Sequence, residues 1–244
     1  MKKSVSLMLT GALLSALFTG CASTSFSIAE SGPYAIMSVS SNVNVPYYSE
    51  EVRDDEYGTE DGLISNAVNK FLGKNNPEII SAEDRVNLAS DRLKALLEEN
   101  GGVEVIDYDK VIESQQYSSI KEGLIGFTDV KLRAYDYKSI DSIGSKKARL
   151  FMKETDTKNL IFATFTFKKR IVKGSKLSGQ ICAYAAANFS VYNERGKNII
   201  NDDFEVQSAE TIEISKLSYD KDELVELFPD LIDQLINQFI VKYM

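Results

Sequence analysis

The last third of the chain restricts the fold most, because long apolar runs alternate there with turns. Residues 160–167 are rich in β-branched and aromatic side chains, which favour a strand. Residues 181–192 place apolar side chains at every second position, and residues 198–214 continue as extended chain after a turn at 193–197. The buried face of the second run would comprise Ile181, Ala183, Ala185, Ala187, Phe189 and Val191. We therefore expect a meander of three antiparallel strands.

The end of the chain predicts a helix that covers this sheet. Asp220 and Glu223 have the spacing of a capping box, so the helix should begin there. Pro229 could either kink the helix or restart it at a first-turn position. The apolar residues recur at helical spacing over a broad stripe, which indicates a face packed on the sheet. They are Leu224, Leu227, Phe228, Leu231, Ile232, Leu235, Ile236, Phe239 and Ile240.

The middle of the chain adds a leading strand and several helices. We expect a strand at 34–39, helices at 63–72, 81–100, 108–114 and 142–154, and a short strand at 103–106. Residues 115–140 show no sustained period. This order predicts an α/β (α+β-like) fold, with a mixed sheet, an antiparallel C-terminal meander, flanking helices and a single domain.

The first residues have the pattern of an export signal. Lys2 and Lys3 precede an apolar run at 5–18, which is shorter than the roughly 20 residues that a membrane span needs. The run ends in Phe18-Thr19-Gly20-Cys21. We expect a signal peptide at 1–20, a flexible tether carrying a lipidated Cys21 at 21–32, and an α/β domain at 33–244. The alternative is a plain signal peptide with a chance cysteine.

The segment before Cys21 resembles a bacterial lipobox, with Phe18 where leucine is usual, as in the relaxed lipoboxes of spirochaete lipoproteins. The resemblance implies diacylglycerol on the Cys21 sulfur and fatty acyl groups such as palmitate, which together give stable anchoring. Ala22 follows where the resemblance would require Asp for retention in the inner membrane. It therefore implies a lipid anchor in the cell envelope, in the outer membrane, facing the periplasm or the cell surface.

Composition narrows the function. The formal net charge is −8 and becomes more negative without Lys2 and Lys3, which disfavours nucleic acid as a partner. The chain has no histidine, so triads of the serine-histidine type and typical zinc sites are excluded. We predict no catalytic residues, no cofactor and no metal. Cys182, the one cysteine besides Cys21, lies in an apolar run and should be buried.

Three groups of residues are candidates for contacts. The acidic run at 50–61 could bind calcium, although its spacing differs from an EF-hand and such runs are usually solvated. Tyr47 and Tyr48 lie in a predicted loop and could either contact a partner or pack on the core. The basic cluster is placed at a predicted hairpin tip, where it could meet anionic headgroups or an acidic partner, or simply protect an edge. It comprises Lys168, Lys169, Arg170, Lys173 and Lys176.

The order of elements, the helix around residues 91–97 and the run Val103-Glu104-Val105-Ile106-Asp107 followed by Tyr108-Asp109-Lys110-Val111-Ile112-Glu113 resemble a known group. This is the periplasmic α/β domain of the curli-secretion lipoprotein, the penicillin-binding-protein activator lipoproteins and the amino-terminal domain of TolB. The resemblance implies a non-catalytic accessory that binds an envelope protein in an assembly or secretion complex. A carboxylate-based hydrolase of envelope glycans and a small-ligand-binding lipoprotein remain alternatives, and the oligomeric state stays open.

Overall fold

The computed structural model describes residues 27–29, 31–49, 76–122 and 132–243. Its centre is a six-stranded mixed sheet in the order β2-β1-β3-β4-β5, in which β6 also pairs with β4. The strands are β1 (Tyr34–Ser41), β2 (Leu132–Arg133), β3 (Asn159–Gly174), β4 (Ser178–Tyr192), β5 (Asn198–Gln207) and β6 (Ile212–Ser215). The predicted fold class, a mixed sheet with an antiparallel meander and flanking helices in one domain, is confirmed.

Strand direction separates the two halves of the sheet. β1 runs parallel to β3, because the chain between them crosses over through helices. β3, β4 and β5 are consecutive and antiparallel, as the meander predicted. The first strand, predicted at 34–39, is buried along its whole length.

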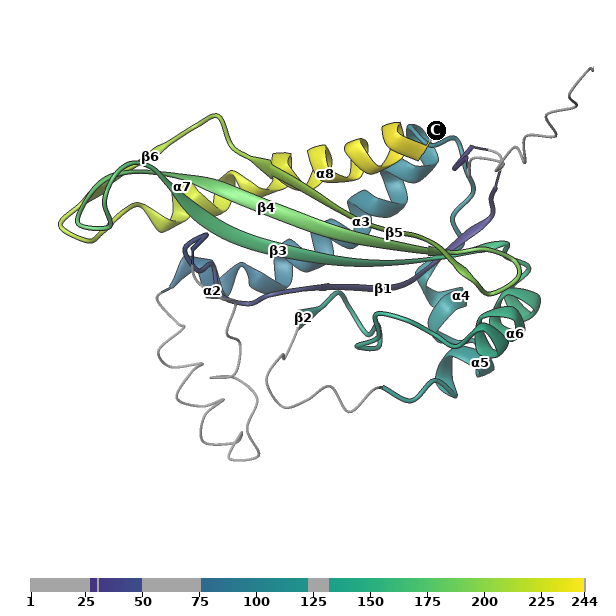
Figure 1. Cartoon of the computed structure of the whole chain (residues 1–244). Helices are drawn as coiled ribbons and strands as arrows, with labels where there is room; N and C mark the ends of the chain where they lie inside the picture. The colour runs from purple at the N-terminus through teal and green to yellow at the C-terminus, as the bar shows by residue number, and fades with distance from the viewer. Residues whose placement is uncertain (1–26, 30, 50–75, 123–131, 244) are drawn as a thin grey trace, which may run out of the picture.

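One face of the sheet is covered by the two long helices α3 (Ala82–Glu99) and α8 (Phe228–Tyr243), which lie side by side on it (Figure 1). The alternation of β4 sends its predicted apolar side chains to this face, where all six are buried. Phe189 of β4 stacks on Phe239 of α8 with ring centroids 4.6 Å apart. The core is therefore an aromatic layer between the meander and α8.

The final helix is divided in two. Asp220 accepts a hydrogen bond from the Glu223 backbone N–H at 3.0 Å and begins α7 (Lys221–Glu226). α8 then restarts at Phe228 with Pro229 as its second residue, so the restart rather than the kink is confirmed. The helix predicted at 81–100 is also confirmed, and Gly102 beyond it has a φ of +64°.

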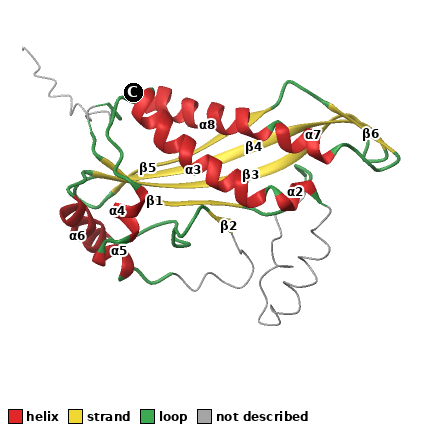
Figure 2. Cartoon of the chain, turned by 180° about the vertical axis from the view of Figure 1, so that it is seen from behind, coloured by secondary structure: helices red, strands yellow, loops and turns green. Residues whose placement is uncertain are grey.

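The opposite face is covered at one end by α4 (Tyr108–Ile112), α5 (Gln115–Ser118) and α6 (Ser145–Thr155), as Figures 1 and 2 show from both sides. α5 was not predicted; Tyr117 anchors it by donating its hydroxyl to the Met37 carbonyl at 2.9 Å. The strand expected at 103–106 was wrong, since a single bridge joins Val105 to Tyr34. The chain turns away there into α4. A further helix, α2 (Pro77–Ile80), precedes α3.

The fold begins before the boundary expected at Pro33. Ile28 is fully buried, and its N–H donates to the Tyr243 carbonyl at 2.8 Å. Its immediate neighbours Ser27 and Ala29 are small, so no apolar run marks Ile28 in the sequence. The signal peptide at 1–20, Cys21, the acidic run at 50–61 and the helix at 63–72 lie outside the described residues.

The basic cluster was expected at the tip of a hairpin, and the chain does turn after Gly174, but the turn begins later than expected because β3 continues as a strand to Gly174. Lysine and arginine disfavour burial but not extended backbone, so the basic residues remained in register with β4. Arg170 pairs with Cys182 and Lys168 with Tyr184. Cys182 is buried as predicted, and burial raises the pKa of its thiol.

The turn between β4 and β5 gives a first testable expectation. Gly196 has a φ of +69°, and an added Cβ would lie 2.4 Å from the Ser145 backbone oxygen at the start of α6. Gly102 has a similar φ of +64° but open space around it. Gly196→Ala should therefore destabilise the fold by more than Gly102→Ala, which incurs only the left-handed strain of about 1–2 kcal/mol. Urea unfolding of both variants measures the difference, and equal losses would contradict the close contact.

A candidate partner-binding surface

The segment after β1 brings the predicted tyrosines onto β3. After β1, the Asn42 side chain makes the hydrogen bonds that a paired strand would make to β3. Its Oδ1 accepts from the Phe167 N–H and its Nδ2 donates to the Phe167 carbonyl, both at 2.8 Å. The chain then rejoins β3, where the Lys169 N–H donates to Pro46 at 2.9 Å and the Tyr48 N–H donates to Lys169 at 2.7 Å. Residues 46–48 thus continue the position of β1 beside β3.

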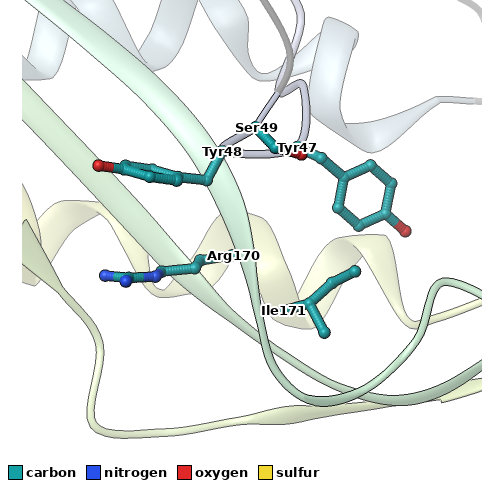
Figure 3. A pocket seen from close by; sticks show the side chains of 5 residues that line it. All are labelled: Tyr47, Tyr48, Ser49, Arg170 and Ile171. Atoms are coloured by element: carbon teal, nitrogen blue, oxygen red, sulfur yellow. The ribbon is translucent and has the colours of Figure 1, made fainter.

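This pairing sends the two tyrosines to opposite faces. Because side chains alternate along extended chain, Tyr47 lies on the side of Lys169, and Tyr48 lies on the side of Lys168 and Arg170. Figure 3 shows Tyr48 above the Arg170 guanidinium, with Tyr47 pointing away from it. The two faces have different chemistry and are described in turn.

On the outer face, the Tyr48 ring is surrounded by cations and a second tyrosine. The Arg170 Cζ lies 4.9 Å and the Lys168 Nζ 5.8 Å from the centre of the Tyr48 ring. The ring of Tyr184 packs edge-on against it at 4.8 Å. Tyr48 nevertheless stays 43% exposed. We call Tyr48, Lys168, Arg170 and Tyr184 the tyrosine–cation surface.

Polar partners on neighbouring strands fix this surface. Arg170 donates to the Gln207 side chain at 3.2 Å, and the Tyr184 hydroxyl donates to Glu205 at 2.6 Å. Burial and the acceptor Glu205 together raise the pKa of Tyr184, so its hydroxyl stays protonated and remains a donor. The surface therefore presents an exposed aromatic ring with positive charge in a fixed arrangement.

On the inner face, Lys169 is 7% exposed and forms a buried ion pair. Its Nζ lies 3.0 Å from Glu78 Oε1 and donates to the Val45 carbonyl at 2.5 Å. The Tyr219 hydroxyl also donates to Glu78, and burial and this bond to Glu78 raise its pKa. Lys169 thus ties α2 and the chain before α7 to β3, and we do not keep it among the contact residues.

Arg85 of α3 completes the buried polar group. Its guanidinium donates to the Glu78 carbonyl at 2.8 Å and to the Val43 carbonyl at 3.0 Å. It also lies over the rings of Phe167 and Phe228, at 5.2 and 5.4 Å from their centres. Burial lowers the pKa of Arg85 to about 10, so the side chain remains charged at neutral pH. This group fixes the backbone from which Tyr47 and Tyr48 extend.

A shallow pocket of about 160 Å³ lies beside the surface, lined by Tyr47, Tyr48, Ser49, Arg170 and Ile171 (Figure 3). Pockets for small organic ligands usually measure about 300–1,000 Å³. This one would accept a single side chain of a partner. Within the described part of the chain, no three His, Cys, Asp or Glu side chains gather where they could hold a metal ion. No described helix has the length and apolar character required to span a bilayer.

Two sets of residues that the sequence suggested separately therefore meet at one place: Tyr48 after β1, and Lys168 and Arg170 from β3. Tyr47 lies on the opposite face, where the Lys169 Nζ is 5.1 Å from the centre of its ring. Lys173 is exposed further along β3, beyond an irregularity in its pairing with β4. Tyr184 and Glu205 were not predicted. The alternation of residues 181–192 could have revealed Tyr184, because it occupies the face opposite the apolar one.

Comparisons with known proteins identify no family for this chain. No protein-family model and no curated protein matches the chain. Among solved structures, the C-terminal domain of LpoB from Salmonella enterica matches over 72% of this chain and 82% of that chain, at 10% sequence identity and a TM-score of 0.28. A score this low does not establish a shared fold, so the match carries no assignment of function.

Proposed function

We propose that this protein is a membrane-anchored, non-catalytic lipoprotein of the cell envelope that binds a partner protein within an assembly or secretion complex. Lipid on Cys21 would hold it on the outer membrane, facing the periplasm or the cell surface. The observation that carries the proposal is the exposed Tyr48 ring, held between Arg170 and Tyr184 at the edge of a small pocket.

The chemistry of this surface suits a protein partner. Tyrosine and arginine are enriched at the centres of protein interfaces, where a rigid ring loses little entropy on binding. The Arg170 and Lys168 cations favour carboxylates on the partner, which the acidic remainder of this chain would otherwise repel. A partner that offers an acidic side chain next to an apolar one would satisfy both the cations and the ring.

The test is a pull-down from detergent-solubilised envelope with mild crosslinking, followed by affinity measurement with the protein recovered. Tyr48→Ala should weaken binding by about 2 kcal/mol, or roughly 30-fold in Kd, if Tyr48 is a central contact. Tyr135→Ala is the matched control, since Tyr135 is a similarly exposed tyrosine (46%) on the chain after β2. That control should bind like the unmodified protein.

The same experiment separates anchoring from binding. Labelled palmitate should enter the unmodified protein and not the Cys21→Ala variant, and washing should remove the variant from membranes far more readily than the anchored form. If Tyr48→Ala and Tyr135→Ala bound the partner equally, the tyrosine–cation surface would not be the contact. If no defined envelope protein were recovered with the anchored form, the accessory function itself would fail.

A further inference from the structure

The far end of the β3–β4 hairpin carries a feature outside the proposed partner surface. The tetrapeptide Ser-Lys-Leu-Ser occurs twice, at residues 175–178 between β3 and β4 and at residues 215–218 after β6. The two copies lie side by side: Ser178 is paired with Ser215 in the sheet, and the Leu217 N–H donates to the Leu177 carbonyl at 3.2 Å. We call them the paired turns.

Both leucines project into solvent. Leu177 is 60% and Leu217 is 66% exposed, although leucine normally seeks the interior. Val172, near the end of β3, is exposed as well. Exposed apolar side chains that gather at one place mark an interaction site more often than scattered ones do.

The backbone of the second turn is held in an unfavourable conformation. Ser215 and Ser218 exchange backbone hydrogen bonds of 2.8 and 3.0 Å, and the two residues between them, Lys216 and Leu217, have φ of 53° and 68°. Hairpin turns with positive φ at both central positions strongly favour Asn-Gly, because Lys and Leu are strained there. Two residues with strained backbone at a hairpin tip indicate that their side chains have a function, because glycine or asparagine would form the turn more easily.

The charge around the leucines is basic. Residues 171–179 contain Lys173 and Lys176 and no Asp or Glu, although the chain as a whole has a net charge of −8. Lys173, Lys176 and Lys216 flank the two leucines in sequence. The nearest acids along the chain are Glu213 and Asp220, each outside the turn that Lys216 begins. Each of the paired turns therefore carries a lysine and no acid, although acidic residues flank the second turn on both sides.

We propose that the paired turns dock into the surface of a lipid bilayer with anionic headgroups, with Leu177 and Leu217 in the acyl boundary and the lysines at the phosphates. A protein partner would have to offer a cavity shaped for each leucine. A bilayer needs no such cavity, because its acyl chains rearrange around any apolar side chain. Apolar residues with a basic rim provide both attractions that interfacial binding uses.

The paired turns lie at the opposite end of the sheet from the C-terminus, against which Ile28 pairs (Figure 1). An amino-terminal anchor and the paired turns would therefore hold the protein at its two ends. Contact of both with one bilayer would lay the long axis of the sheet along that bilayer. The inference does not depend on the partner-binding function, because Leu177, Leu217 and Lys216 lie outside the tyrosine–cation surface. Lys176 is the link between the two regions, since its Nζ lies 4.4 Å from the centre of the Tyr47 ring.

The chain has no tryptophan, so one introduced indole reports its own surroundings. In the full chain reconstituted with phosphatidylglycerol-containing vesicles, Leu217→Trp should show blue-shifted emission and quenching by brominated lipid. Leu150→Trp, at an exposed leucine on α6, should show neither. A lipid anchor would act equally on both variants, so the difference reports the tip alone. Replacing Lys173 and Lys216 by Gln should reduce the quenching several-fold.

A second variant separates docking from a structural role. Lys216→Asn with Leu217→Gly should raise the melting temperature by relieving strain, while Leu177→Trp in that background should lose most of its quenching. Three results would overturn the proposal: equal emission from Leu217→Trp and Leu150→Trp, quenching that is the same in vesicles without anionic lipid, or a blue shift that requires an added envelope protein and not lipid.

Discussion

Replacing Lys169 by Met should lower the free energy of unfolding by about 3–5 kcal/mol, as expected when one partner of a buried ion pair is removed. Within the described part of the chain, the Glu78 carboxyl would remain in the interior with the Tyr219 hydroxyl as its remaining side-chain donor. The same pair holds α2 against β3, so the loss should extend to the packing around it. Urea unfolding followed by circular dichroism measures the effect.

Two controls sharpen this expectation. Lys168→Met changes the neighbouring lysine on the outer face and should alter stability by no more than about 0.5 kcal/mol. Lys169→Met combined with Glu78→Leu removes both charges and should recover most of the loss, because the burial penalty disappears with the pair. If Lys169→Met were no more harmful than Lys168→Met, the interior position of Lys169 would be refuted.

The ion pair also shows where prediction from the sequence ends. Residues 168–170 form a continuous basic run, and nothing local distinguishes the middle lysine from its neighbours. Its partner Glu78 lies 91 residues earlier, in a helix of four residues that has no apolar period. Burial of Lys169 follows from strand alternation only once the run is known to be strand, and charge had argued for a turn.

Elements with a strong apolar period could be predicted, because burial acts on every residue of one face. The apolar face of β4 and the stripe of α8 are determined by one strong term, burial, that acts at each position. The tyrosine–cation surface was predictable only as two unconnected parts. Their meeting depends on the Asn42 side chain, which substitutes for backbone pairing at Phe167 and keeps the chain beside β3. No sequence period encodes such a contact.

The paired turns could be predicted only in part from the sequence. The repeated Ser-Lys-Leu-Ser is visible in the sequence, but four residues recur easily by chance. Only the pairing of β4 with β6, which brings Ser178 beside Ser215, makes the repeat into one surface. The positive φ of Lys216 and Leu217 then shows that the second turn has a strained backbone, which an ordinary polar turn lacks.

Phe239→Ala should cost about 3–5 kcal/mol, the usual loss for truncating a buried aromatic ring. Phe239 of α8 is fully buried, stacks on Phe189 at 4.6 Å, and meets the Phe204 ring edge-on at 6.1 Å. It therefore joins α8 to both β4 and β5. Since a domain has only about 5–15 kcal/mol of stability in total, the variant should be close to unfolding at ambient temperature.

The control lies two residues further along the same helix. Val241 is 76% exposed, so Val241→Ala should change stability by about 0.5 kcal/mol or less, and Phe239→Leu should fall between the two. Because α8 forms the cover of the aromatic layer, its helical signal and the signal of the sheet should disappear in one transition. If Phe239→Ala lost helix content well before the sheet melted, α8 would be a separately folding cover, and the single core inferred from these ring contacts would be wrong.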